Sequence, residues 1–282
     1  MTGGAGNDRY LFDVDQVQGA DTINEAGGGI DTLDFSATTT RGISLNLANP
    51  AVQIVSAGFL TLNLSAGNTI ENVIGGSLAD ALTGNSLNNL LVGGAGNDFY
   101  GFDTDTSLGS DTINEAGGGI DTLWFGATTA RSIAIDLSNP AAQIVTASNL
   151  TLTLSSSFTI ENVIGGSLGD TLVGNVLANT ITGGPGSDTL TGSSGDDVYL
   201  FDTDSALGSD TINDASGIDT LDFSSTTTVG VTANLGNAAL QTVNANLSLT
   251  LSSATSIENV IGGSLGDTLT GNTLTNNLTG GP

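Results

Sequence analysis

Residues 165–200 read GGSLGDTLV GNVLANTIT GGPGSDTLT GSSGDDVYL when they are divided into groups of nine. Each nonapeptide has Gly at its first position, an acid or amide at its sixth and an apolar residue at its eighth. This period is too long for one face of a helix and too regular for loops, and it suits a short strand that alternates with a tight turn. The segment therefore predicts a coil of strands and turns wound around a narrow apolar core.

The sixth position of the nonapeptide holds the side chains that could bind a metal ion. Glycine allows backbone angles that other residues avoid, so successive turns can lie close together. Carboxylates at the sixth position then stack from coil to coil and repel one another unless a divalent cation lies between them. Calcium suits such turns because it takes about six to eight oxygen ligands, backbone carbonyls included.

A longer repeat contains the nonapeptides. DTINEAGGGIDTL starts at Asp21 and Asp111, and DTINDASGIDTL starts at Asp210, so the copies start 90 and 99 residues apart. The two steps differ by one nonapeptide. We expect a single continuous solenoid over residues 1–282, cut from a longer array. Its three units are expected at about 3–92, 93–191 and 192–282.

The composition limits the possible partners. The chain has 29 acidic and 3 basic residues, with a net charge of −26, which excludes nucleic acid and favours cations. It has no Cys and no His, which excludes disulfides, the usual zinc ligands and the usual general base. No apolar run approaches the ~18 residues of a membrane helix, so we expect no membrane span.

Four nonapeptides resemble the RTX (hemolysin-type) calcium-binding repeat, GGxGxDxUx, in which U is a large apolar residue. GGAGNDRYL at 3–11, GGAGNDFYG at 93–101 and GGPGSDTLT at 183–191 match it, and GSSGDDVYL at 192–200 departs only at its second position. The resemblance implies an all-β fold, a right-handed parallel β-roll or β-solenoid in which two nonapeptides form one coil. It also implies several calcium ions between turns of neighbouring coils, held by Asp carboxylates and turn carbonyls.

The expected calcium ligands follow from this resemblance. In the four matching nonapeptides they are Gly3, Ala5, Asn7, Asp8, Gly93, Ala95, Asn97, Asp98, Gly183, Pro185, Ser187, Asp188, Gly192, Ser194, Asp196 and Asp197. Weaker copies of the motif add Asp21, Asp31, Asp111, Asp121, Asp210 and Asp219. Three further copies have Leu in place of the fourth-position Gly, and we expect incomplete occupancy there. Their sixth-position residues are Asp80, Asp170 and Asp267.

Two other kinds of residue occupy the sixth position. Glu71, Glu161 and Glu258 precede the recurring NVIGG, and they are either ligands or solvated residues at the edge. GNSLNNLLV, GNVLANTIT and GNTLTNNLT have Asn instead of Asp. Because Asn is uncharged and a weaker calcium ligand, we expect calcium-poor turns there, with Asn side chains hydrogen-bonded along the solenoid.

The middle of each unit differs from the rest. Residues 35–70 and 223–257 contain no acid, and 125–160 contain only Asp136. Runs such as LTLNLS alternate apolar and polar residues, which indicates half-buried strands. Each middle segment either supplies about two calcium-free coils, which we favour, or forms a small inserted sheet. Calcium-rich and calcium-free coils are thus expected to alternate.

The leading interpretation is a calcium-binding structural module of an extracellular or cell-surface bacterial protein. It would form an adhesin stalk, a surface layer or a matrix filament. The resemblance implies type I secretion of an unfolded chain that folds on calcium outside the cell. The repeat shows no polar cap at its ends, so we expect self-association through uncapped solenoid ends. A secretion and folding module attached to a secreted enzyme is the main alternative.

A third interpretation is a solenoid that binds ice or polysaccharide. It would use Thr38–Thr40, Thr226–Thr228, Trp124 and the three Tyr residues, for which we favour ordinary structural roles. Each of Tyr10, Tyr100 and Tyr199 occupies an eighth position, which predicts core packing. The adjacent acids Asp196 and Asp197 could suggest glycoside hydrolysis, but no cleft signature surrounds them. We therefore expect no enzymatic activity and no catalytic residue.

Overall fold

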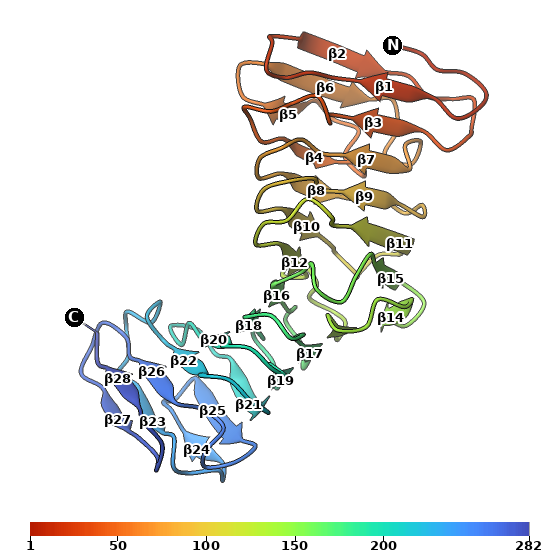
Figure 1. The fold of residues 1–282 in the computed structure, drawn as a ribbon. Helices are drawn as coiled ribbons and strands as arrows, with labels where there is room; N and C mark the ends of the chain where they lie inside the picture. The colour runs from red at the N-terminus through yellow and green to blue at the C-terminus, as the bar shows by residue number, and fades with distance from the viewer. Residues whose placement is uncertain (282) are drawn as a thin grey trace. The chain divides into compact units, whose positions relative to one another are not determined.

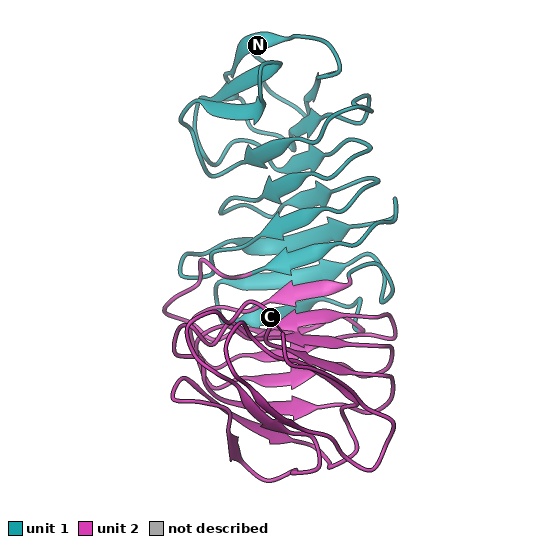
Figure 2. Cartoon of the chain, turned by 90° about the vertical axis from the view of Figure 1, so that its left-hand side faces the viewer, with its two compact units in different colours: residues 1–124, 139–160 teal, residues 125–138, 161–282 magenta. Residues whose placement is uncertain are grey.

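The computed structural model describes residues 1–281, so Pro282, the last residue of the third expected unit, lies outside it. Every element in the described part of the chain is a β-strand (Figure 1). The chain divides into two compact units, 1–124 with 139–160 and 125–138 with 161–282 (Figure 2). Within each unit most strands pair in parallel, which confirms the all-β solenoid. The single continuous solenoid of three repeats stays a prediction.

Unit 1 contains three rows of hydrogen-bonded strands. The longest has the order β1 (Arg9–Leu11), β3 (Thr32–Asp34), β7 (Asn72–Ile74), β9 (Leu90–Val92), β11 (Gly109–Asn114), β15 (Leu150–Leu154) and β14 (Gln143–Thr146). The second has the order β12 (Thr122–Trp124), β10 (Phe99–Gly101), β8 (Ala81–Thr83) and β4 (Ser44–Asn46). The third has the order β2 (Gly19–Ile23), β6 (Leu60–Leu64) and β5 (Gln53–Ser56).

Unit 2 repeats this plan. One row has the order β28 (Asn277–Thr279), β26 (Asn259–Ile261), β22 (Thr220–Asp222), β20 (Val198–Leu200), β18 (Thr180–Thr182) and β16 (Asn162–Ile164). Another has the order β13 (Ala134–Asp136), β17 (Thr171–Val173), β19 (Thr189–Thr191), β21 (Gly208–Asn213), β25 (Leu247–Leu251) and β24 (Gln241–Thr242). The third pairs β23 (Thr232–Asn234) with β27 (Thr268–Thr270).

The strand register gives the size of a coil. Ala81 of β8 pairs with Phe99 of β10, and Thr171 of β17 pairs with Thr189 of β19. Each step is 18 residues, which is two nonapeptides. The predicted coil is therefore confirmed where the nonapeptides run in tandem.

The middle segments form one long coil each, and the expectation of about two coils is wrong. Thr32 of β3 pairs directly with Asn72 of β7, so a single turn of the solenoid takes 40 residues. Within it β6 pairs in parallel with β2 along five residues, and β5 folds back antiparallel onto β6. The alternating pattern thus forms a longer strand with its own hairpin partner, because an antiparallel neighbour needs only a short turn.

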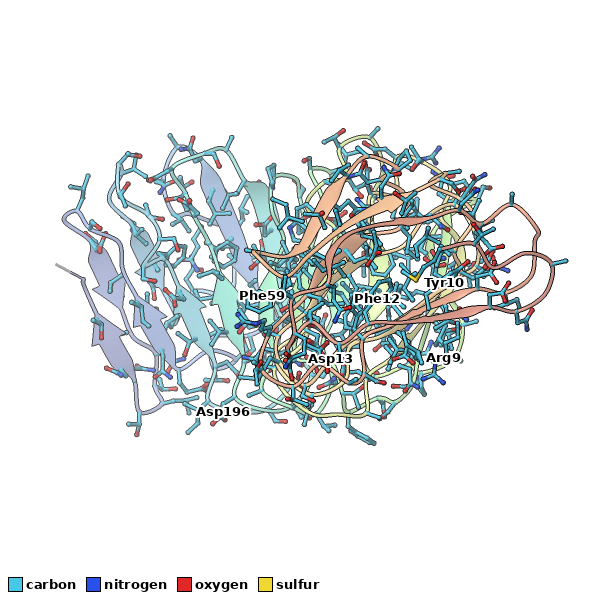
Figure 3. All side chains as sticks on the ribbon, turned by 90° about the horizontal axis from the view of Figure 1, so that it is seen from above. Arg9, Tyr10, Phe12, Asp13, Phe59 and Asp196 are labelled. Carbon is cyan, nitrogen blue, oxygen red and sulfur yellow. The ribbon has the colours of Figure 1, made fainter. Side chains whose placement is uncertain are left out.

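The core lies inside the coils. Leu33, Leu82 and Leu172 are completely buried, as expected for inward-facing positions of short strands. The rings of Phe12 and Phe35 stack with their centroids 5.0 Å apart. In Figure 3, Phe12 lies within the ribbon, whereas the exposed Arg9 lies outside it.

Candidate metal centres

Glycines bring the turns of neighbouring coils into contact. A Cβ atom on Gly117 would collide with the carbonyl oxygen of Gly94, and one on Gly119 would collide with that of Gly96. Gly94 and Gly96 also have φ values of 101° and 119°, which L side chains rarely adopt. Only glycine fits these places, so the turns stack closely and align the sixth-position side chains of successive coils.

Sixth-position Asp side chains form ladders along the stack. The backbone N–H of Asp170 donates to Asp188 Oδ1 at 2.8 Å, and that of Asp188 donates to Asp210 Oδ1 at 2.9 Å. In the other row, the N–H of Asp80 donates to Asp98 Oδ1 at 2.8 Å. In each step of the ladder, which we call a rung, one carboxylate oxygen therefore accepts an N–H from the neighbouring coil. The rungs differ in whether the second oxygen of the carboxylate also has a hydrogen-bond donor.

On most rungs the second oxygen is buried and lacks a hydrogen-bond donor. This applies to Oδ2 of Asp8, Asp98, Asp111, Asp188, Asp197, Asp210 and Asp267. Burial raises the pKa of Asp111, Asp188 and Asp210 to about 7. A buried ionised oxygen without a partner is costly, so these positions require a cation or a proton. Stacked carboxylates with free oxygens fit a hard divalent cation such as calcium.

Asp80 and Asp170 differ, because both of their oxygens have donors. Asp80 accepts the N–H of Ile43 at 2.7 Å and that of Gly76 at 2.6 Å, and Asp170 makes the equivalent pair of bonds. These two carboxylates serve as caps for backbone groups, which agrees with the doubt about their occupancy. Asp267, grouped with them by its sequence, instead keeps an unpartnered Oδ2.

In the Asn turns, the Asn side chains find their hydrogen-bond partners within the protein, as predicted. Asn89 accepts the N–H of Asn85 at 2.7 Å through Oδ1 and donates through Nδ2 to the carbonyl of Glu71 at 2.9 Å. Asn179 donates to the carbonyl of Glu161 at 2.9 Å in the same way. A neutral amide offers both a donor and an acceptor, so it joins two coils without a cation.

The recurring glutamates extend the ladder. Glu71 Oε2 accepts the N–H of Asp31 at 2.7 Å, and Glu258 Oε2 accepts the N–H of Asp219 at 2.9 Å. Glu71 and Glu258 therefore occupy rungs of the stack, where they are half-buried, and calcium ligation by them stays a prediction. Asp21, by contrast, is only half-buried in β2.

The other predicted ligands lie in the turns. Fifth-position side chains bridge coils: Asn7 accepts the N–H of Ile30 at 2.9 Å, and the exposed Asp196 accepts that of Ile218 at 2.9 Å. Asp196 lies at the periphery of the ribbon in Figure 3. Asn97 and Ser187 accept backbone N–H groups in the same way, whereas first-position glycines lie against Oδ2 of their own Asp. Those glycines are Gly3, Gly93, Gly183 and Gly192. Carbonyl ligation by these turns, including Ala5, Ala95, Pro185 and Ser194, stays a prediction.

The structure also brings together three groups of carboxylates, which we call the three-carboxylate clusters. In each cluster one oxygen of every member lies within 4.8 Å of the others. The clusters are Asp8–Glu25–Asp31, Asp98–Glu115–Asp121 and Asp197–Asp214–Asp219. Two members of each were predicted, but Glu25, Glu115 and Asp214 were missed. The available signal was an acid that recurs four residues after the Asp of each DTIN copy.

A tyrosine hydroxyl belongs to each cluster. Tyr100 donates a hydrogen bond to Glu115 Oε2, Tyr10 donates to Glu25, and Tyr199 donates to Asp214 Oδ2 at 2.6 Å. The predicted burial of these rings is confirmed, whereas the role of the hydroxyls was not anticipated. Burial raises the pKa of all three tyrosines, so the hydroxyls stay protonated and remain donors.

Burial is the main influence on the pKa of Glu115 and Asp219, whereas the hydrogen bond from Tyr10 lowers the pKa of Glu25 in the first cluster. Burial raises the pKa of Glu115 to about 8, although the hydrogen bond from Tyr100 opposes this. It raises the pKa of Asp219 to about 7, and the neighbouring Asp214 and Asp197 charges add to the effect. Like charges held together without a counter-ion favour protons, and a divalent cation supplies the alternative.

The residues considered for ice or sugar binding have structural roles. Thr38 is completely buried, and the N–H and hydroxyl groups of Thr39 and Thr40 donate to Asp15. Trp124 packs against Phe99 with ring centroids 5.6 Å apart. The hydroxyls of Thr227 and Thr228 donate to Asp204 in the same way as those of Thr39 and Thr40 donate to Asp15, so these exposed threonines do not present free hydroxyls.

Comparison with known proteins supports the calcium assignment. Residues 21–116 match the family model for the Peptidase M10 serralysin C terminal. No curated protein shows significant similarity to the chain. In the described residues, no helix is long and apolar enough to span a membrane. The matched family is an RTX repeat domain that binds calcium, and the matched segment contains the three tandem nonapeptides at 75–101, with Asp80 and Asp98 of the ladder. Residues 21–116 are therefore similar to the RTX-type calcium-binding repeat domain at the C-terminus of serralysins, which is consistent with an RTX nonapeptide repeat region.

Proposed function

We propose that this chain is the structural module of an extracellular bacterial protein and that calcium drives its folding after secretion. The observation that carries the proposal is the set of buried Asp Oδ2 atoms without donors on the ladder. Without calcium these atoms hold uncompensated charge, which opposes stacking of the coils. With calcium the same atoms become ligands that join one coil to the next.

The energetics agree with a switch at extracellular calcium concentrations. Calcium sites of extracellular modules have dissociation constants of about 0.1 to 1 mM. A site at about ten times its dissociation constant adds about 1.4 kcal/mol to the free energy of unfolding. Several such sites acting together would convert a chain with a net charge of −26 from an expanded state into a stacked solenoid. At low cytosolic calcium the same chain would stay unfolded and competent for export through type I secretion.

A calcium titration of chelator-treated protein tests this proposal, followed by far-ultraviolet circular dichroism with magnesium as the control. We expect a cooperative gain of β-structure with calcium and none with magnesium at the same concentration. Magnesium is smaller and prefers rigid octahedral sites with bound water. Full β-structure in excess chelator would contradict the proposal.

A second candidate function is a secretion and folding module attached to a secreted enzyme. The observation that favours it is the match to a domain that takes its name from the C-terminal part of a peptidase. The repeat region is non-catalytic in itself. Fusion of the chain to the C-terminus of a reporter enzyme in a type I secreting strain tests this role, with export expected only when the chain is present.

We also propose that the exposed edge strand β28 supports assembly into a stalk or filament. Leu278 of β28 is 40% exposed, whereas the equivalent Leu91 of β9 is completely buried because β11 lies beside it. Pairing with a second copy would bury Leu278 in the same manner. Sedimentation in calcium should show species larger than a monomer, and Leu278→Lys should abolish them. A wild-type monomer at all concentrations would refute assembly through this edge.

A further inference from the structure

Three places in the molecule differ chemically from the Asp ladder. They are the three-carboxylate clusters, each of which adds a carboxylate from outside the sixth position of the nonapeptide. In the second cluster, Glu115 follows β11, and Asp98 and Asp121 lie in the turns before β10 and β12. The backbone N–H of Asp98 donates to Asp121 Oδ1 at 2.8 Å, so the two turns are already joined on one side. The third member, Glu115, places a carboxylate oxygen within 4.8 Å of an oxygen of each of these two residues.

Unpartnered buried oxygens occur in the second and third clusters. Asp98 and Glu115 are each 1% exposed, and neither Asp98 Oδ2 nor Glu115 Oε1 has a hydrogen-bond partner. In the third cluster the same is true of Asp197 Oδ2 and Asp214 Oδ1. Hydrogen bonds within the protein do not account for these atoms, so the second and third clusters each present two oxygens that require a ligand. In the first cluster only Asp8 Oδ2 lacks a donor, because Gly4 and Tyr10 donate to the two oxygens of Glu25.

The tyrosine determines which oxygen of the third carboxylate is free. Tyr100 donates to Glu115 Oε2, and the unpartnered atom is Glu115 Oε1. Tyr199 donates to Asp214 Oδ2, and the unpartnered atom is Asp214 Oδ1. The hydroxyl thus holds one oxygen of the third carboxylate and leaves the other without a donor.

A glycine makes room for this convergence. A Cβ atom on Gly93 would collide with Asp98 Oδ2, Tyr100 Oη and Glu115 Oε2 at once. Gly3 lies in the same position beneath Asp8, Glu25 and Tyr10. Oxygens from two segments of the chain therefore surround a residue that has no side chain, and this leaves space for an ion of moderate size.

We propose that the second and third three-carboxylate clusters are calcium sites of a second class, in which Glu115 or Asp214 is a ligand whose other oxygen is held by the adjacent tyrosine hydroxyl. This inference rests on the proposed calcium-binding function. Oxygens up to 4.8 Å apart can lie on opposite sides of a cation with bonds of about 2.4 Å, which is a calcium distance and too long for magnesium. Three carboxylates also bring more negative charge than one ladder Asp with carbonyls, so the clusters should fill first in a calcium titration.

Terbium luminescence tests this directly. Terbium(III) takes calcium sites with oxygen ligands, and it emits when a nearby aromatic ring transfers energy to it. The chain contains three tyrosines, and each donates a hydrogen bond within one cluster. A Trp124→Phe background removes the single tryptophan, so that tyrosine is the only strong donor. We expect tyrosine-sensitised emission at low terbium and its displacement by calcium.

Glu115→Gln should remove the share of this emission that comes from the second cluster and should lower the calcium stoichiometry by one ion per chain. Asp103→Asn is the matched control, because it removes one charge from an exposed residue outside the clusters. Tyr100→Phe should lose the same share of emission while it keeps the calcium stoichiometry. If Glu115→Gln fails to fold, Asp214→Asn in the third cluster gives the same comparison.

The outcomes separate this inference from the proposed function. If the wild-type protein gains β-structure with calcium and Glu115→Gln binds as many ions as Asp103→Asn, the clusters are not calcium sites and only this inference fails. If the wild-type protein neither binds terbium nor responds to calcium, the proposed function itself fails. A loss of one ion in Glu115→Gln alone supports the inference.

Discussion

Two neighbouring rungs of one ladder provide a matched pair of substitutions. Asp170 and Asp188 are 2% and 1% exposed, and the N–H of Asp170 donates to Asp188 Oδ1 at 2.8 Å. They differ in the second oxygen. Asp170 Oδ2 accepts the N–H of Gly166 at 2.6 Å, whereas Asp188 Oδ2 has no donor. Asp188→Asn should therefore remove a calcium ligand, and Asp170→Asn should remove only a backbone cap.

The expected magnitudes follow from this difference. At about 10 mM free calcium, a site with a dissociation constant of about 0.1 to 1 mM adds about 1.4 to 2.7 kcal/mol to the free energy of unfolding. Asp188→Asn should lose most of this increment. In chelator above neutral pH the same substitution should stabilise the protein, because burial raises the pKa of Asp188 to about 7 and its ionised form lacks a partner. Asp170→Asn should cost about 1 to 3 kcal/mol with or without calcium, since it leaves a buried N–H without an acceptor.

The assay is thermal unfolding of both variants and the wild type, in chelator and in calcium, with magnesium as the control. The quantity of interest is the increase in Tm on adding calcium. It should be smaller in Asp188→Asn than in the wild type and unchanged in Asp170→Asn. Equal losses of this increase in the two variants would refute the assignment of ligands by their unpartnered oxygens.

Three further predictions concern pH, glycine and asparagine. In chelator the Tm should fall as the pH rises from about 5 to about 8, because burial raises the folded-state pKa of Asp111 and Asp210 to about 7 and the folded chain therefore keeps protons that the unfolded chain has lost. Calcium should remove most of this fall in Tm. A Tm that does not change with pH in chelator would contradict the prediction. Gly117→Ala should destabilise the fold strongly, since its Cβ would collide with the carbonyl of Gly94, whereas Gly266→Ala meets nothing within 4 Å and should be tolerated in the same denaturant titration. Asn179→Asp should lower the Tm in chelator by losing the donor to the Glu161 carbonyl, and an unchanged Tm would show that this bond contributes nothing.

Much of the fold could be predicted from the spacing of residues alone. A glycine, an acid and an apolar residue at constant positions in each nonapeptide are local requirements, which every coil repeats. They are sufficient to predict parallel coils of 18 residues, Tyr100 and Leu82 in the core, and Asp98 on a ladder. The Asn turns were predictable for the same reason, because an amide hydrogen-bonds where a carboxylate would need an ion.

The middle segments were harder to predict. A strand such as β6 has the same alternating sequence pattern whether it begins a new coil or pairs within a long coil. The choice depended on β2, whose five residues pair with β6, and on the hairpin that β5 forms with β6. The alternation of apolar and polar residues within one segment does not reveal which distant strand that segment pairs with.

The sequence by itself determined which residues face a neighbouring coil, because the nonapeptide repeats with the coil. The tertiary structure alone decided which of these residues need a cation. Asp80 and Asp98 occupy the same place in the motif, yet the N–H of Gly76 satisfies the second oxygen of the first, and no donor reaches that of the second. Only the folded chain brings Glu115 and the hydroxyl of Tyr100 to Asp98 and Asp121. The physical reason is that a carboxylate's demand for a cation depends on the donors within hydrogen-bond distance, and those donors come from other coils.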